Sequence, residues 1–131
     1  MTHSATISKR FHFSASHALG GLPPEHQCSR LHGHNYDVEV RINGITDDVG
    51  FVVDYSLLAP FGAYLDATFD HRHLNDALSF NPTAENLGAH LATILLSILP
   101  KDALPRLNWV EVGISETPRS NAWVRITVAQ S

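Results

Sequence analysis

The sequence lacks several features that would place the protein outside the cytoplasm or on a nucleic acid. It has one cysteine, so it cannot form an internal disulfide, and its N-terminus lacks the basic start and apolar core of a signal peptide. No apolar run approaches the roughly 20 residues that span a bilayer. Lys and Arg total only 9, are scattered, and leave a net charge of -4. These absences predict a cytoplasmic protein with no membrane or nucleic-acid partner.

The remaining composition is that of an ordinary globular domain. Hydrophobic residues make up 44% and charged residues 17% of 131 residues, a length that fits one domain covering residues 1–131. There is no short repeat, low-complexity segment or linker. The unusual count is histidine, at 9.

Hydrophobic alternation predicts strands near both ends of the chain. Residues 5–14 and 36–43 alternate apolar and polar side chains, and a loop rich in Gly and Pro over residues 18–30 separates them. Two further strands are expected at residues 107–114 and 122–128, joined by a turn over residues 117–121.

Helical spacing of apolar residues occupies the middle of the chain. A first helix is expected over residues 56–68, with its start shifted by Pro60 towards residues 56–58. A second begins near residue 83, capped by Asn81 or Thr83 with Pro82 in its first turn, and ends before Pro100. The order strand, strand, helix, helix, strand, strand predicts an α+β fold with an antiparallel sheet and helices on one face.

Three histidines are candidate metal ligands. His32 and His34 flank Gly33 at the start of a strand, where alternate side chains project from the same face. His17, at the end of the first strand, completes a three-nitrogen set if the two strands are neighbours, and it leaves one tetrahedral position open as in catalytic zinc sites. A His-x-His pair alone is weak evidence, but Cys28 lies only four residues before His32. A carbonyl or carboxylate should accept the other ring N–H of at least one ligand.

Further candidate groups have both a chemical and a plain structural interpretation. Beside a dication, a cysteine ionises readily and can act as base or nucleophile, although Cys28 could instead be a small buried apolar residue. Asp70 and His71 form a candidate acid–base pair or a polar junction after a helix. Glu116, at a strand end, could accept two parallel hydrogen bonds from an amidine-like ring edge or could be a solvated turn residue.

Four motifs are spread over nearly the whole chain: Cys28 to Tyr36 (CSRLHGHNY), Asp70-His71, residues 82–86 (PTAEN) and Glu116-Thr117. Together they resemble the 6-pyruvoyltetrahydropterin synthase family. The three residues between Cys28 and the His-Gly-His pair are similar to the 6-carboxytetrahydropterin synthase branch of queuosine and deazapurine biosynthesis. Residues 69–76 (FDHRHLND) also resemble a pattern of that branch.

The resemblance implies a fold, an assembly and a reaction. The fold is the tunnelling fold, with a four-stranded antiparallel sheet and two helices on one face. Subunits join into rings as a trimer or a dimer of trimers, with active sites at subunit interfaces. The substrate is 7,8-dihydroneopterin triphosphate, and the products are 6-carboxy-5,6,7,8-tetrahydropterin, acetaldehyde and triphosphate.

The resemblance also implies a role for each candidate residue. Zn²⁺ is held by His17, His32 and His34. Cys28 removes protons, with His71 as its acid–base partner and Asp70 orienting that histidine. The pterin ring is bound by Glu116, assisted by Thr83. Three arginines, Arg30, Arg72 and Arg119, are candidates for the triphosphate, and the sequence does not rank them.

The sequence departs from the family pattern at Ser115, where some carboxy-branch enzymes have lysine, and it has no second cysteine after Glu116. Within the family, the rival activity is pyruvoyl-forming, with triphosphate elimination and no carbon loss. Outside it, His32-x-His34 followed by Glu39 resembles a cupin metal motif, which two central helices argue against. The same residues are also compatible with a zinc-independent cysteine hydrolase or with a non-enzymatic zinc-stabilised module.

Overall fold

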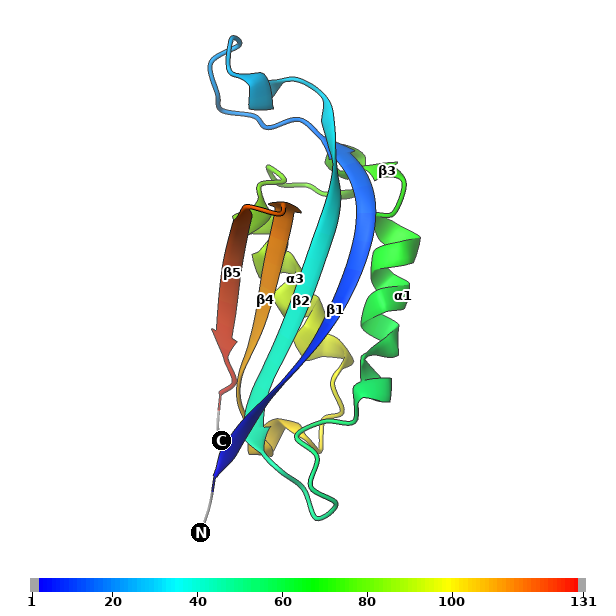
Figure 1. The fold of residues 1–131 in the computed structure, drawn as a ribbon, viewed down its shortest axis with the longest axis vertical. Coiled ribbons are helices and arrows are strands. Elements are labelled where there is room, and N and C mark those ends of the chain that lie inside the picture. Colours follow the sequence, from blue (N-terminus) through cyan, green and yellow to red (C-terminus); the bar gives the residue numbers. More distant parts are fainter. Residues whose placement is uncertain (1–2, 130–131) are drawn as a thin grey trace.

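A computed structural model describes residues 3–129, and its main feature is a five-stranded sheet with helices packed on one face (Figure 1). The strand order is β3-β1-β2-β4-β5. The strands are β1 (Ser4–His17), β2 (His32–Ile45), β3 (Arg72–His73), β4 (Leu107–Thr117) and β5 (Ser120–Thr127). All neighbours are antiparallel except β3, which runs parallel to β1.

The helices follow the predicted order with short additions. They are α1 (Ala59–Thr68), the one-turn α2 (Leu74–Ala77) and α3 (Ala84–Ile98), with 3-10 turns η1 (Gln27–Ser29), η2 (Tyr55–Leu58) and η3 (Leu104–Arg106). The longest helix, α3, packs on β4 and β5, whereas α1 lies against β1. Within residues 3–129 no helix is long and apolar enough to cross a membrane.

The hydrophobic core lies between the sheet and the helices. On β2 the alternate residues Tyr36, Val38, Val40 and Ile42 are fully buried, and on β1 Phe13 stacks against Tyr36 with ring centroids 4.8 Å apart. Burying one such aliphatic side chain stabilises the fold by about 1.5–3 kcal/mol, so slipping β2 by one residue would cost several of these contributions. The core therefore fixes which β2 residues face the helices.

Two details differ from the sequence prediction. The sheet has a fifth strand, β3, which pairs only at Ala15–Arg72 and Ser16–His73 and is too short to show an alternating pattern. Pro82 does not lie in the first turn of α3, because Thr83 is the N-cap and the helix begins at Ala84. The first strand also continues beyond the alternating residues 5–14, and it ends at His17.

Candidate metal centre

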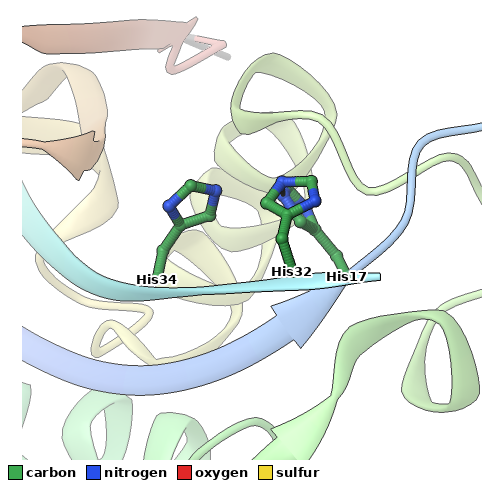
Figure 2. Close-up of side chains that lie close together, drawn as sticks. All are labelled: His17, His32 and His34. Atoms are coloured by element: carbon green, nitrogen blue, oxygen red, sulfur yellow. Dashed lines mark hydrogen bonds between the residues drawn. The ribbon is translucent and has the colours of Figure 1, made fainter. Parts of the chain in front are cut away.

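Three imidazole rings meet where β1 ends and β2 begins. His17 and His32 are direct cross-strand partners, and His34 is two residues further along the same face of β2. That face is the core face, because Tyr36 and Val38 continue the same alternation. Figure 2 shows the rings on one side of the β2 strand, and the possible ligand atoms of all three lie within 4.8 Å of one another. The structure thus brings the predicted ligand set together as one cluster.

Backbone carbonyls hold two of these rings in the tautomer that a metal requires. His17 Nδ1 lies 2.9 Å from the Pro82 carbonyl oxygen, and His32 Nδ1 lies 2.7 Å from that of Arg30. A carbonyl only accepts, so each Nδ1 carries the proton and each neutral ring keeps a lone pair on Nε2. The two Nε2 atoms are only 2.8 Å apart. Two lone pairs at that distance repel each other, whereas both would be attracted to a cation bound between them. The donor set therefore fits a metal ion.

The surroundings of His17 favour its neutral form. Burial is the main effect and lowers its pKa, with His32 and His34 acting in the same direction. The hydrogen bond to Pro82 and the negative charge of Glu116 oppose that shift. A neutral imidazole is the form that coordinates a metal, so burial favours metal binding near neutral pH.

Glu116 also points at this cluster, from the end of β4. One carboxylate oxygen lies 3.3 Å from His17 Nε2 and 3.6 Å from His34 Nε2, and 27% of the side chain is exposed. The family resemblance implied that Glu116 binds a pterin ring, but the sequence gave no sign that Glu116 lies against the histidines. Its carboxylate can accept hydrogen bonds from a ligand that sits next to the metal.

Cys28 shares a cavity with the histidines, here called the histidine pocket. The pocket measures about 480 Å³ and is lined in part by His17, Cys28, His32, His34, Glu116 and Thr117. Cys28 lies in η1, within the predicted loop, and its carbonyl accepts a hydrogen bond from Leu19 N–H at 2.9 Å. The loop is therefore tied back on itself beside the three histidines.

His26 is a residue of this site that sequence reasoning missed. It is the N-cap of η1, and its Nδ1 accepts the backbone N–H of Cys28 at 3.0 Å. The available signal was a side chain able to accept a hydrogen bond, placed two residues before the cysteine, which is the spacing of a cap. This bond orients the turn that carries Cys28.

Asp70 and His71 interact with each other but do not lie in the histidine pocket. His71 Nδ1 is 2.9 Å from one Asp70 oxygen, and the other oxygen accepts the Ser14 N–H at 2.9 Å. That backbone hydrogen bond is the main cause lowering the pKa of Asp70. His71 adopts a positive φ of 58°, and 82% of its side chain is exposed.

His71 instead lines a second cavity, here called the edge pocket, of about 470 Å³. Its lining includes Ser14, Ser16, Asn35, His71, Arg72 and His73, at the β3 edge of the sheet. Gly33 and His34 line both pockets, so the two are neighbours across the start of β2. Within one chain the structure does not bring Cys28 and His71 into one cavity.

Thr83, the second predicted substrate contact, caps α3. Its hydroxyl oxygen accepts the Asn86 N–H at 3.1 Å, and Thr83 does not line the histidine pocket. The hydroxyl proton stays available for a further hydrogen bond.

A histidine cluster that could hold a metal ion lies at the strand ends of this helix-covered α+β sheet, and the architecture is the tunnelling fold. The 6-pyruvoyl tetrahydropterin synthase family model matches residues 6–127. The chain belongs to this family.

Curated relatives and solved structures agree with that assignment. The chain is 34% identical over 114 residues to a putative 6-carboxy-5,6,7,8-tetrahydropterin synthase of Archaeoglobus fulgidus, covering 87% of this chain and 88% of the relative. It is 33% identical to the 6-carboxy-5,6,7,8-tetrahydropterin synthase of Bacillus subtilis, covering 90% and 83%. The structure of Caenorhabditis elegans 6-pyruvoyl tetrahydropterin synthase superposes with a TM-score of 0.78 at 26% identity, covering 95% of this chain and 97% of that one.

Proposed function

We propose that this protein is a zinc-dependent 6-carboxy-5,6,7,8-tetrahydropterin synthase. It would convert 7,8-dihydroneopterin triphosphate to 6-carboxy-5,6,7,8-tetrahydropterin, acetaldehyde and triphosphate. The observation that carries the proposal is the convergence of three histidines beside Cys28 in one cavity. It is supported by relatives of that name at 33–34% identity over most of the chain.

Zinc is the metal that suits this donor set best. Three neutral imidazoles with an open fourth position form a common catalytic zinc site, and the carbonyls behind His17 and His32 are the usual partners of ligating histidines. Bound there, zinc would act as a Lewis acid on the hydroxyl oxygens of the substrate side chain.

The chain's own residues would bind the substrate and move protons. A volume of about 480 Å³ lies within the usual range for small-ligand sites. Glu116 would accept two hydrogen bonds from the amino-pyrimidine edge of the pterin, which places the side chain of the substrate near the histidines. Cys28, as thiolate, would remove a proton from that side chain. Thr83 can donate its hydroxyl proton to the pterin while its oxygen caps α3.

The partner of Cys28 would come from another copy of the chain. Cys28 and His71 lie in different pockets, so a reaction that uses both needs His71 and Asp70 from a neighbouring subunit. Among the described residues, no strand pairs with the outer edge of β5. The outer edge of β1 pairs with β3 at only two residues. Pairing of such edges between copies would form a ring, and we expect a trimer or a dimer of trimers.

The test of the function is product identification. Zinc-loaded protein is incubated with 7,8-dihydroneopterin triphosphate, and the pterin and the volatile product are identified by mass spectrometry. We expect 6-carboxytetrahydropterin together with acetaldehyde. A 6-pyruvoyl product would instead indicate the pyruvoyl-forming activity. If fully zinc-loaded protein does not turn over the substrate, the protein is a non-enzymatic module and the proposal is wrong.

The rival interpretations outside this family are less well supported. A cupin is a β barrel, whereas this chain has a helix-covered open sheet, so the cupin interpretation is wrong. A cysteine hydrolase would need Cys28 next to His71, and the structure places them in separate pockets. It would also retain activity after zinc removal, which the synthase would not.

A further inference from the structure

The side chains of three of the seven arginines have neither an acidic partner nor a hydrogen bond to a backbone carbonyl among residues 3–129. Arg10, Arg41 and Arg125 pair with Glu39 or Glu111, and the Arg106 guanidinium donates to backbone carbonyls of Ile45, Phe51 and Val52. The remaining three are Arg30, Arg72 and Arg119. These are the three arginines that the sequence leaves unranked for the triphosphate.

The pockets distinguish Arg72 from the other two. Arg72 lines the edge pocket next to His71, whereas neither Arg30 nor Arg119 lines that pocket or the histidine pocket. An arginine without a carboxylate partner keeps all five of its N–H donors for a ligand. Of the three candidates, Arg72 alone shares a cavity with a proposed catalytic group.

The rest of the edge pocket also suits an anion. No carboxylate side chain lines it. The Ser14 hydroxyl donates to the Asn35 carbonyl oxygen at 2.7 Å, which leaves the two N–H donors of that amide for a ligand. Ser16 and His73 form a second polar pair, with the Ser16 oxygen 3.0 Å from His73 Nδ1.

The negative charge of Asp70, which contacts His71, is partly neutralised. Both of its oxygens are engaged, one by Ser14 N–H and the other by the His71 ring. An anion in the edge pocket would therefore face Arg72 and Asn35 with no carboxylate in the pocket lining.

We infer that the edge pocket binds the triphosphate group of the substrate, with Arg72 as its principal cation. The inference rests on the proposed function and extends it to a separate subsite. In the elimination step a C–O bond breaks, its electron pair leaves on the phosphate oxygen, and the proton of the neighbouring carbon passes to the acid–base groups. The guanidinium offsets the charge that develops on the leaving oxygen. His71 lines the same pocket, so proton transfer and anion binding occur at the same end of the substrate side chain.

The test measures binding of inorganic triphosphate to the zinc-loaded full-length protein by titration calorimetry. Arg72→Gln should weaken binding about tenfold or more, the loss of roughly one charge-assisted contact. Arg72→Lys should fall between wild type and Arg72→Gln, because lysine keeps the charge but not the planar fork of donors. Lys101→Gln is the matched control, since Lys101 is an exposed cation in the turn between α3 and η3 and lines neither pocket. It should bind triphosphate like wild type.

A second ligand separates a phosphate site from a general loss of structure. Arg72→Gln should bind 7,8-dihydroneopterin, which carries no phosphate, as tightly as wild type, with unchanged zinc content. Wild-type triphosphate affinity in Arg72→Gln would overturn the inference, and so would a larger loss in Arg30→Gln or Arg119→Gln. These measurements need no turnover, so a failure of the proposed activity would be seen separately in the product assay.

Discussion

The histidine pocket and the edge pocket are built in different ways, although they share Gly33 and His34. The histidine pocket is walled by the ends of β1, β2 and β4 and by the loop that carries Cys28, and backbone carbonyls orient two of its rings. The edge pocket lies beside the shortest strand, and its acid–base candidate His71 is mostly exposed. One chain thus completes the three-histidine cluster but leaves His71 of the proposed acid–base pair mostly exposed.

The alternation of β1 contributes to the separation of the two pockets. His17 is on the core-facing set of β1 residues, whereas Ser14 and Ser16 are on the opposite set and line the edge pocket together with Ala15 of the core-facing set. Neighbouring residues of one strand therefore supply two pockets with different chemistry. Substitutions in the two pockets should therefore have different effects. The largest effect is expected when a proposed metal ligand is removed.

Removing a metal ligand should have the largest effect. His17→Ala deletes one of three donors, so zinc affinity should fall by more than the roughly 10–100-fold typical of losing an outer-shell partner. Competition with a chromogenic chelator measures the affinity. His3→Ala, an exposed histidine outside the cluster, should bind zinc like wild type. Active wild-type protein without zinc would contradict the metal site itself.

Cys28→Ala should separate proton transfer from metal binding within the histidine pocket. We expect kcat to fall by about 10²–10⁴-fold, the usual range for losing an acid–base group, while zinc content and pterin affinity stay unchanged. Steady-state kinetics and metal analysis of the same samples measure both. Turnover at the wild-type rate would mean that Cys28 has only a structural role.

Glu116→Gln should weaken substrate binding more than it slows turnover. The amide presents a donor in place of one acceptor, so KM and the dissociation constant of a pterin product analogue should rise by about tenfold. Because Glu116 lies 3.3 Å from His17 Nε2, zinc content must be measured as well. Loss of zinc with unchanged pterin affinity would make Glu116 a metal ligand instead of a ring anchor.

The smallest expected effect is a pH-dependent change in stability at the edge pocket. The Ser14 hydrogen bond lowers the pKa of Asp70 in the folded protein below the ordinary 3.8. The stabilisation is therefore present above that value and is lost as the pH falls through the lowered pKa. Asp70→Asn should unfold at a lower temperature than wild type at pH 7, and the two should converge as the pH falls through the lowered pKa of Asp70. A difference that is the same at all pH values would contradict a role for the charge.

Much of this architecture could be predicted from the sequence, because the spacing of apolar residues along a segment shows which side chains are buried. The alternation in β1 and β2 and the apolar stripe of α3 predicted the order of elements, and the His-x-His spacing predicted that two rings share a face. The strand β3 could not be predicted, because two residues carry no period and its position depends on the positive φ of His71.

Contacts between segments that are far apart in the sequence could not be predicted either. The carbonyl of Pro82, 65 residues from His17, fixes the tautomer of that histidine. The approach of Glu116 to the histidines depends on the register of β4 against β2. The resemblance to a family supplied a role for Asp70 and His71, but no local pattern shows that they face away from Cys28.

The central claim is that both pockets serve one active site shared between copies of the chain. It is tested by co-expressing Cys28→Ala and His71→Ala chains with different affinity tags and purifying the mixed oligomers through both tags. Each variant alone should be nearly inactive on 7,8-dihydroneopterin triphosphate. Mixed oligomers should regain activity, because some sites combine an intact Cys28 with an intact His71 from a neighbour. Zinc-loaded mixed oligomers, verified by native mass spectrometry, that are no more active than their parents would contradict the claim.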